Sequence, residues 1–299
     1  MVECDILIIG SGPAGLSASS YASRSGYNTL VIDNMGPGGQ LMFIDKIENY
    51  PGFEQISGYE LAERFEKQSE LFGAKIDYIE ALSIEKKDRR FFVKTNSDEI
   101  VSKAVIIATG ASHKHLGVDG EDEYSGKGVS YCATCDGPFF KNKDVVVVGG
   151  GDTALTDALY LSKLCSSVTI VHRRDKFRAE RILQERVSKT TNIKSMLSCS
   201  VAKINGDGNK VTSVSLSNGD FLKCDGVFIF VGTVPNSSLV DGICALKDGY
   251  IETNDRMETS LEGLFAAGDV RRTSFRQVVT AAGDGARAAH SADEYIQEL

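Results

Sequence analysis

A glycine-rich turn between an apolar run and a helix occurs twice in this chain, and this repeat constrains the fold more than any other feature. The first copy has an apolar run over 5–9, the turn over 10–15 and a helix that ends near residue 25. The second copy has an apolar run over 145–148, the turn over 149–154 and a helix that ends near residue 164. One such turn is a weak signal, but two in strand–turn–helix context predict two βαβ dinucleotide-binding units.

The distance from each turn to the end of the next strand supports the repeat. Gly10 and Asp33 are 23 positions apart, and Gly149 and His172 are also 23 positions apart. The alternative is a pair of unrelated glycine-rich turns, and the equal spacing disfavours it.

The glycines of each turn have separate physical roles. Gly10 permits a tight bend, Gly12 lets the backbone approach a pyrophosphate, and Gly15 lets helix and strand pack closely. The helix N-terminus then presents free N–H groups to the phosphates. We therefore expect cofactor contacts from Gly10, Ser11, Gly12, Pro13, Ala14 and Gly15 in the first turn, and from Gly149, Gly151, Asp152, Thr153 and Ala154 in the second.

The two copies differ at the end of the second strand. The first copy has Asp33, whose carboxylate can accept hydrogen bonds from a ribose 2′-hydroxyl. The second copy has no acid at the matching position and continues as a basic segment. An arginine can bind a 2′-phosphate bidentately, whereas a carboxylate would repel it. The second site is therefore expected to prefer NADPH to NADH, through His172, Arg173, Arg174 and Arg178, and the first is expected to hold a different dinucleotide, most simply FAD.

Further apolar runs predict how the two copies are connected. Residues 104–110, 226–232 and 263–270 are expected to be buried strands, and 276–292 a helix rich in small residues. We expect the last strand and helix to return to the first copy. The prediction is an α/β fold of two Rossmann-like, three-layer domains. The FAD-binding domain comprises 1–114 and 242–299, and the NADPH-binding domain, 115–241, is inserted into it.

A close pair of cysteines lies just before the second turn. Cys132 and Cys135 can open and close a disulfide reversibly, and the adjacent Asp136 can supply or take a proton. A dithiol beside a nicotinamide site indicates electron transfer from a hydride donor to a disulfide. Zinc binding together with His113 and His115 is an alternative, although the spacing is not that of a known zinc finger.

Composition excludes several classes of partner. The net charge of -8 argues against a nucleic-acid surface, which needs clustered Lys and Arg. No apolar run approaches the ~20 residues that span a bilayer, and the N-terminus lacks the basic region of a signal peptide. The chain has seven cysteines with a single close pair, unlike a secreted disulfide framework. We expect a cytoplasmic protein with no nucleic-acid or membrane partner.

These motifs together resemble the low-molecular-weight, bacterial-type NADPH-dependent thioredoxin reductases over nearly the whole chain. The strings CATCDG at 132–137 and HRRxxFRA at 172–179 are specific to this group. In the larger disulfide reductases the cysteine pair lies in the FAD domain, whereas no cysteine lies near 38–41 here. The other matching motifs are both glycine-rich turns, GGQL at 38–41, ENYPG at 48–52, ATGA at 108–111, GDV at 268–270 and RQ at 276–277.

The resemblance implies a homodimer that passes electrons from NADPH through FAD and the Cys132–Cys135 disulfide to thioredoxin. It implies that Cys135 lies nearer the flavin, that Cys132 attacks or releases the partner's sulfur, and that Asp136 is the acid–base group. For Asp136 to be protonated near pH 7, burial should raise its pKa.

The resemblance also implies further cofactor contacts. Asp33 to Gln40 would wrap the adenosine and pyrophosphate, Asp269 would bind the ribityl chain, and Asn49 would lie near the flavin. The full set of these contacts is Asn34, Gly38, Gly39, Gln40, Leu41, Asn49, Ala108, Thr109, Gly110, Gly268, Asp269, Arg276, Gln277 and Val278, the last three against the flavin ring.

The cysteine pair and the NADPH motif lie on the same inserted domain, yet each must reach the flavin in turn. We therefore expect this domain to rotate about the joins near residues 114 and 242.

One departure from the family pattern affects the partner. Pro138 stands where the first of two phenylalanines usually follows CATCDG, and Phe139 and Phe140 come one position later. We therefore expect altered partner docking. Two alternatives stay open: a reductase or oxidase of the same fold that acts on another dithiol partner, and an NADPH or redox sensor without turnover.

Overall fold

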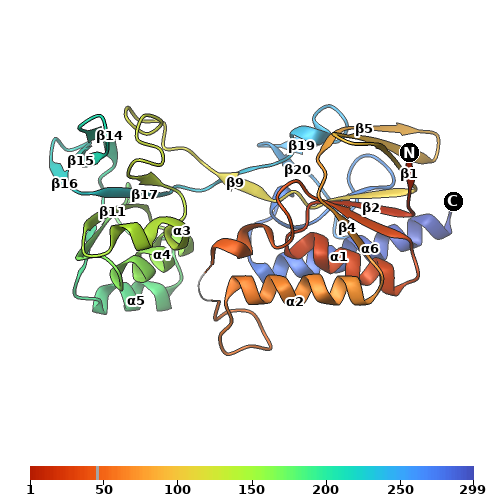
Figure 1. The fold of residues 1–299 in the computed structure, drawn as a ribbon, viewed down its shortest axis with the longest axis horizontal. Helices are drawn as coiled ribbons and strands as arrows, with labels where there is room; N and C mark the ends of the chain where they lie inside the picture. The colour runs from red at the N-terminus through yellow and green to blue at the C-terminus, as the bar shows by residue number, and fades with distance from the viewer. Residues whose placement is uncertain (45–46) are drawn as a thin grey trace. The chain divides into compact units, whose positions relative to one another are not determined.

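The computed structural model describes residues 1–44 and 47–299, and this part of the chain divides into two compact units (Figure 1). The first unit consists of Met1–Ser112 and Val234–Leu299, and the second is His113–Thr233. The second unit is therefore inserted into the first.

A parallel sheet forms the centre of the first unit. Each strand is a short aliphatic run, and β2, β3, β8 and β21 are buried throughout, as expected for parallel strands that are covered on both faces. The order is β21-β8-β2-β3-β4. The strands are β2 (Ile6–Ile9), β3 (Thr29–Ile32), β4 (Lys75–Asp77), β8 (Ala104–Ile107) and β21 (Leu264–Ala266).

Helices α1 (Pro13–Arg24), α2 (Gly58–Leu71) and α6 (Val278–Gln297) cover one face of this sheet (Figure 1). Pro13 begins α1, where its missing N–H costs nothing. α6 lies very close to α1, because a Cβ at Gly285 would be 2.0 Å from the carbonyl oxygen of Ala14. The small residues of this segment thus serve helix packing. The predicted helix over 276–292 begins two positions later, at Val278, because Gln277 and Thr280 form a capping box there.

An antiparallel sheet covers the other face of the parallel sheet. β1 (Val2–Glu3) pairs in parallel with β7 (Glu99–Ser102), which continues antiparallel to β6 (Arg90–Thr95) and β5 (Ala81–Lys87). Shorter elements of this unit are η1 (Gly39–Phe43), η3 (Ser238–Val240), η4 (Gly268–Val270), β19 (Leu246–Lys247) and β20 (Tyr250–Ile251).

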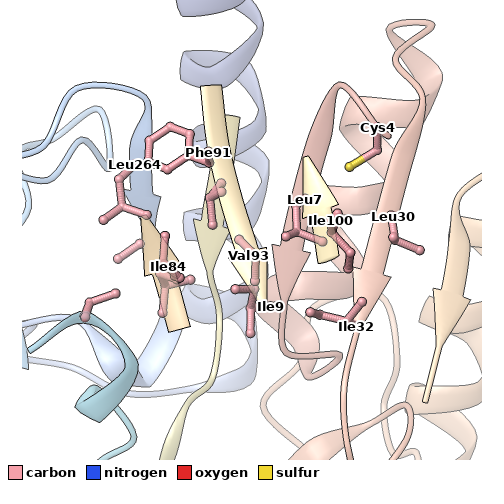
Figure 2. Close-up of a cluster of buried hydrophobic side chains, with 14 of the residues drawn as sticks. Cys4, Leu7, Ile9, Leu30, Ile32, Ile84, Phe91, Val93, Ile100 and Leu264 are labelled. Carbon is pink, nitrogen blue, oxygen red and sulfur yellow. The ribbon is translucent and has the colours of Figure 1, made fainter. Parts of the chain in front are cut away.

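The core of the first unit follows the alternation of side chains along β2. Leu7 and Ile9 pack with Phe91 and Ile100 of the antiparallel sheet (Figure 2). Ile6 and Ile8 pack on the opposite face with alanines of α1 and α6. Successive strand residues point to opposite faces, so this one run forms part of both hydrophobic clusters.

The second unit repeats this arrangement. Its parallel sheet has the order β10-β17-β11-β12-β13, and an antiparallel sheet has the order β14-β15-β16. The strands are β10 (Val129–Ser130), β11 (Asp144–Gly149), β12 (Ser167–Val171), β13 (Ile193–Met196), β14 (Val201–Gly206), β15 (Val211–Leu216), β16 (Phe221–Lys223) and β17 (Gly226–Phe230). The helices are α3 (Ala133–Asp136), α4 (Asp152–Ser162) and α5 (Arg181–Lys189), with the 3-10 turn η2 (Gly137–Phe140) after α3.

Alternation along β11 again divides the core. Val145 and Val147 pack in one cluster with residues of α4, and Val146 and Val148 pack in another with residues of β14 and β15. Both units therefore have a layer of helices, a parallel sheet and an antiparallel sheet, and the predicted fold class is confirmed.

The second predicted boundary needs correction. The sequence placed it after residue 241, whereas the units divide between 233 and 234. Residues 234–241 pack with the first unit, because Val240 is fully buried in its core and the side chain of Asn236 donates to the Thr109 carbonyl at 2.9 Å. The short strands that contain the two joins, β9 (Ala111–His113) and β18 (Thr233–Pro235), pair with each other.

Candidate active site

The first glycine-rich turn is built as the sequence predicts for a pyrophosphate site. A Cβ at Gly10 would lie 2.3 Å from the Ala108 carbonyl oxygen, and one at Gly15 would lie 1.8 Å from the Gly10 carbonyl oxygen. At Gly12, by contrast, no atom of the described residues would lie within 4 Å. Gly12 also precedes α1, whose first turn no side chain of residues 1–44 or 47–299 caps. The open space and the uncapped N–H groups fit a phosphate group.

Asp33 joins this turn to the loop after β3. Its Oδ2 accepts from the Ser11 backbone N–H at 2.8 Å and from the Ser11 hydroxyl at 2.9 Å. Its Oδ1 accepts from the N–H groups of Met35 at 2.8 Å and Gly36 at 3.2 Å. These donors occupy about the four acceptor positions of a carboxylate, so a ribose hydroxyl would have to share an oxygen with them. The ribose contact stays a prediction.

Several predicted cofactor residues lie against the first turn. The Gly38 N–H donates to the Ser11 carbonyl at 2.8 Å, and a Cβ at Gly39 would be 3.3 Å from the Gly12 Cα. Gln40 donates from Nε2 to the Ala111 carbonyl at 2.5 Å. The segments 38–40 and 108–111 therefore meet the turn at the carboxyl ends of the parallel strands, where ligands of such sheets bind.

The C-terminal segment brings further predicted residues to this unit. Asn49 donates from Nδ2 to Gln277 Oε1 at 3.0 Å, although 228 positions separate them. The Arg276 guanidinium lies 4.2 Å from the ring centroid of Tyr250. Its Nε is buried and has no hydrogen-bond partner in the described part of the chain. Such a donor is available to a ligand.

Asp269 on η4 is half-buried, and its carboxylate has no hydrogen-bond partner among residues 1–44 and 47–299. Burial raises the pKa of Asp269, and nearby Arg276 partly offsets this rise. A carboxylate without protein donors fits a polyhydroxyl ligand, because hydroxyl groups can donate to it. The residues of the first unit thus fit the predicted FAD.

The second turn repeats the geometry of the first. A Cβ at Gly149 would lie 2.4 Å from the Phe230 carbonyl oxygen, and one at Gly150 would lie 2.4 Å from the His172 ring. A Cβ at Gly151 would have no described atom within 4 Å, and none of the described side chains caps the first turn of α4. The N-terminus of α4 therefore offers a second phosphate site.

The basic segment after β12 folds back onto this turn. Arg178 donates its backbone N–H to the Gly150 carbonyl at 2.7 Å, and the Asp152 carboxylate accepts the Glu180 N–H at 2.7 Å. Arg173, Arg174 and Arg178 are exposed, and within residues 1–44 and 47–299 none forms an ion pair. Their guanidinium groups are therefore free to bind a phosphate.

His172 differs from these arginines, because it is 6% exposed and packs against Gly150. Burial and the neighbouring arginines lower the pKa of His172. Its Nε2 is buried without a partner in the described structure. A neutral His172 thus supports the turn by packing against Gly150.

The cysteine pair forms a disulfide at the start of α3, with the Cα atoms of Cys132 and Cys135 5.4 Å apart. Ser130 holds Cys132 in place, since its hydroxyl accepts the Cys132 N–H and donates to the Cys132 carbonyl, both at 3.1 Å. Cys135 is exposed and Cys132 is half-buried. Which sulfur faces the flavin and which faces the partner stays a prediction.

Asp136 lies next to the disulfide, because its N–H donates to the Cys132 carbonyl at 3.2 Å. Asp136 is half-buried. Its acid–base role stays a prediction.

No group of three or more His, Cys, Asp or Glu side chains in the described residues has the geometry to hold a metal ion. Cys132 and Cys135 are bonded to each other, whereas zinc binding would require both as free thiolates. In the same residues no helix combines the length and apolar character needed to span a bilayer.

Sequence reasoning missed an ion pair beside the predicted FAD site. Asp284 in α6 accepts from Arg271 Nε at 2.6 Å and from the Gly268 N–H at 3.2 Å. A signal was available, because Asp284 is an acid in a segment of small residues, several of which, such as Ala281, Ala282 and Gly285, are buried. Sequence reasoning also did not identify the half-buried Asp157 as an acid with a raised pKa. Burial raises its pKa to about 7.

Comparisons with known proteins agree with this geometry. The family model described as pyridine nucleotide-disulphide oxidoreductase matches residues 4–285, and the chain belongs to this family. A protein named thioredoxin reductase from Treponema pallidum (strain Nichols) is 49% identical over 303 residues, which cover 99% of this chain and 98% of the relative. Another of that name, from Bacillus subtilis (strain 168), is 47% identical over 302 residues, which cover 99% of this chain and 95% of the relative.

A solved structure is also similar to this chain. The crystal structure of Lactococcus lactis thioredoxin reductase has a TM-score of 0.97 and 43% identity, covering 99% of this chain and all of that one. The predicted resemblance to thioredoxin reductases is thus confirmed over nearly the full chain.

Proposed function

We propose that this chain is a flavoprotein disulfide reductase that passes electrons from NADPH through FAD and the Cys132–Cys135 disulfide to oxidised thioredoxin. The family and the relatives confirm the predicted enzyme class and the cofactors FAD and NADPH. One observation carries the proposal most directly. The Cys132–Cys135 disulfide lies in the same unit as a glycine-rich turn that is flanked by unpaired arginines.

The first unit supplies the proposed FAD site. The N-terminus of α1 and Gly12 hold the pyrophosphate, and the Asp269 carboxylate accepts hydrogen bonds from the ribityl hydroxyls. Asn49 is hydrogen-bonded to Gln277. We assign Gln277, together with Arg276 and Val278, to the flavin ring. Bound FAD supplies the two-electron chemistry that links a hydride donor to a disulfide.

The second unit supplies the proposed NADPH site. Gly151 and the N-terminus of α4 hold the pyrophosphate, and Arg173, Arg174 and Arg178 bind the 2′-phosphate. This phosphate is absent from NADH, so the arginines set the preference for NADPH.

The dithiol steps follow from sulfur chemistry. Two electrons break the Cys132–Cys135 bond and leave one thiolate and, after uptake of one proton, one thiol. We assign this proton transfer to Asp136. The Cys132 thiolate then attacks the partner's disulfide, and a mixed disulfide forms while one partner sulfur leaves as thiolate. Cys135 attacks Cys132 next, which restores the disulfide and releases the reduced partner.

The redox pair and the NADPH site lie in the same unit, yet each must reach the flavin at a different step of turnover. We propose that this unit rotates about the joins at 112/113 and 233/234 during turnover.

Two surfaces support the proposed partners. Phe139 lies four positions after Cys135 and is 74% exposed, so it offers an apolar contact to thioredoxin.

In the first unit Tyr21, Phe65 and Phe72 line a shallow cavity between α1 and α2, and Tyr59 and Leu71 are exposed on α2. The exposed members of this set, Tyr21, Tyr59, Leu71 and Phe72, support a homodimer. Cys4, Cys165, Cys199, Cys224 and Cys244 are free thiols, which agrees with a reducing cytoplasm.

The proposal is tested with FAD-loaded protein, NADPH, thioredoxin and an aromatic disulfide that colours on reduction. Rapid colour that requires thioredoxin supports it. Equal turnover without thioredoxin would favour another dithiol partner, and oxidation of a single equivalent of NADPH without turnover would favour a sensor.

A further inference from the structure

A buried ion pair lies directly behind the turn η4. Asp284 projects from α6 and is 8% exposed, and the Arg271 side chain is 15% exposed. Arg271 donates to both carboxylate oxygens, from Nε to Oδ2 at 2.6 Å and from Nη2 to Oδ1 at 3.3 Å. This two-point geometry fixes the guanidinium plane relative to α6.

The pair holds both ends of the turn that carries Asp269. The Gly268 N–H donates to the same Asp284 oxygen at 3.2 Å, and Arg271 follows the turn at its other end. Arg271 also donates from Nη1 to the Thr253 hydroxyl at 2.9 Å. The backbone of Asp269 is therefore fixed on both sides, while its carboxylate has no hydrogen-bond partner among the described residues.

Stability alone does not account for this pair. Close packing already joins α1, α6 and η4. A Cβ at Gly285 of α6 would be 2.0 Å from the Ala14 carbonyl oxygen, and one at Gly268 of η4 would be 2.9 Å from the Ala14 Cβ. A buried ion pair adds little to such packing, because the desolvation of two charges offsets their attraction. A role in orienting a neighbouring group is the better explanation.

We propose that Asp284 and Arg271 are positioning residues that hold the Asp269 carboxylate for the polyhydroxyl chain of FAD and so set the affinity for this cofactor. The inference rests on the proposed function of the first unit. Neither side chain is expected to touch the cofactor.

The central variant is the double substitution Arg271→Met/Asp284→Leu. It removes both charges together, whereas Asp284→Asn alone leaves a buried Arg271 without its counter-ion and can fail to fold. Protein stripped of FAD is titrated with FAD, and binding is followed by the quenching of FAD fluorescence. We expect the double variant to melt within a few degrees of the wild-type apoprotein and to bind FAD about tenfold more weakly, because the effect passes to Asp269 through the backbone that they share.

A cycle with Asp269→Ala separates positioning from a general structural effect. Once Asp269 is truncated, the pair has nothing left to position. The double substitution should then change the FAD dissociation constant by less than about twofold in that background.

Arg272→Met is the matched control, because Arg272 is adjacent in sequence but exposed and paired with Glu252 at 3.4 Å. It should leave FAD affinity unchanged. An unchanged affinity in the double variant, or an equal loss with and without Asp269, would overturn the inference. Wild-type apoprotein that does not bind FAD would instead overturn the proposed function.

Discussion

The two glycine-rich turns have similar backbone packing and differ in the side chains that flank them. In both, the last position before the helix is a glycine with open space around it, Gly12 in the first and Gly151 in the second. Asp33 closes the first turn by accepting bonds from Ser11 and the loop that follows. Exposed arginines flank the second turn instead. A duplicated scaffold can thus bind two dinucleotides, with the choice made by the residues after the second strand.

The variant with the largest expected effect tests whether the second unit alone carries out the thiol chemistry. Cys135→Ser removes one sulfur of the redox pair, so thioredoxin-dependent turnover should fall to background. FAD and NADPH binding should be unchanged, because the disulfide takes part in neither turn. The coupled colour assay and cofactor titrations measure both. Cys165→Ser, which changes a buried free thiol of the same unit, should keep turnover, and activity retained in Cys135→Ser would contradict the assignment.

The arginines that distinguish the second turn are the next target. Arg173→Ala/Arg178→Ala should raise KM for NADPH by more than about a hundredfold, since each of the two lost charge-assisted bonds to phosphate is worth about 1.5–3 kcal/mol. KM for NADH should not change, because NADH has no 2′-phosphate. Steady-state kinetics with both nucleotides measure the difference.

Arg181→Ala is the control for this variant, as Arg181 is exposed and paired only with Glu185 in the described structure. A parallel loss with NADH would show that the arginines act on the fold rather than on the phosphate.

Glycines within one turn should separate folding from binding. Gly15→Ala places a methyl group 1.8 Å from the Gly10 carbonyl oxygen, so it should destabilise the first unit by about 3 kcal/mol or more. Gly12→Ala meets no described atom, so it should leave the melting temperature of the apoprotein unchanged and weaken FAD about tenfold. Calorimetry and FAD titration measure the two effects. Normal FAD affinity in the Gly12→Ala variant would contradict the assignment of the pyrophosphate to this turn.

A smaller effect concerns one helix position that differs between the units. Asp157 in α4 corresponds to Ala18 in α1, counting from the glycine before each helix, and Ala18 is fully buried. Burial raises the pKa of Asp157 to about 7 in the folded protein. The folded state therefore binds this proton more tightly than the unfolded state. The associated stability is complete below the unfolded pKa of 3.8 and is lost as pH rises through about 7.

Asp157→Asn should remove this loss. Its free energy of unfolding should exceed that of the wild type by about 1–4 kcal/mol at pH 8, because each unit of pKa shift corresponds to about 1.4 kcal/mol. At pH 3 the two free energies should be similar. Denaturant melts at the two pH values measure it. Asp175→Asn changes an exposed acid of the same unit and should show no such difference. Equal effects of Asp157→Asn at both pH values would rule out this titration.

The sequence predicted what depends on local pattern. Runs such as 145–148 identified the parallel strands, and the glycines located both turns, because these features need particular residues at adjacent positions. Long-range contacts were less accessible. The second join was misplaced because Val240 reveals its unit only through the core that it enters. The small-residue run of α6 predicted a helix, but not that Asp284 pairs with Arg271.

Site residues divide in the same way. The pairing of Cys132 with Cys135 followed from their spacing, and the structure contains that disulfide. The half-burial of Asp136 depends on how α3 lies on its unit, which spacing does not encode. The contact of Asn49 with Gln277 joins residues far apart in sequence, and family resemblance alone predicted that both lie near the flavin.

An anaerobic absorbance titration with NADPH tests the central claim most directly. If flavin and disulfide act in series, the wild type should consume about two equivalents of NADPH per FAD before the flavin bleaches fully, and Cys132→Ser/Cys135→Ser should consume about one. About one equivalent in the wild type, or a purified protein that cannot be loaded with FAD, would contradict the account.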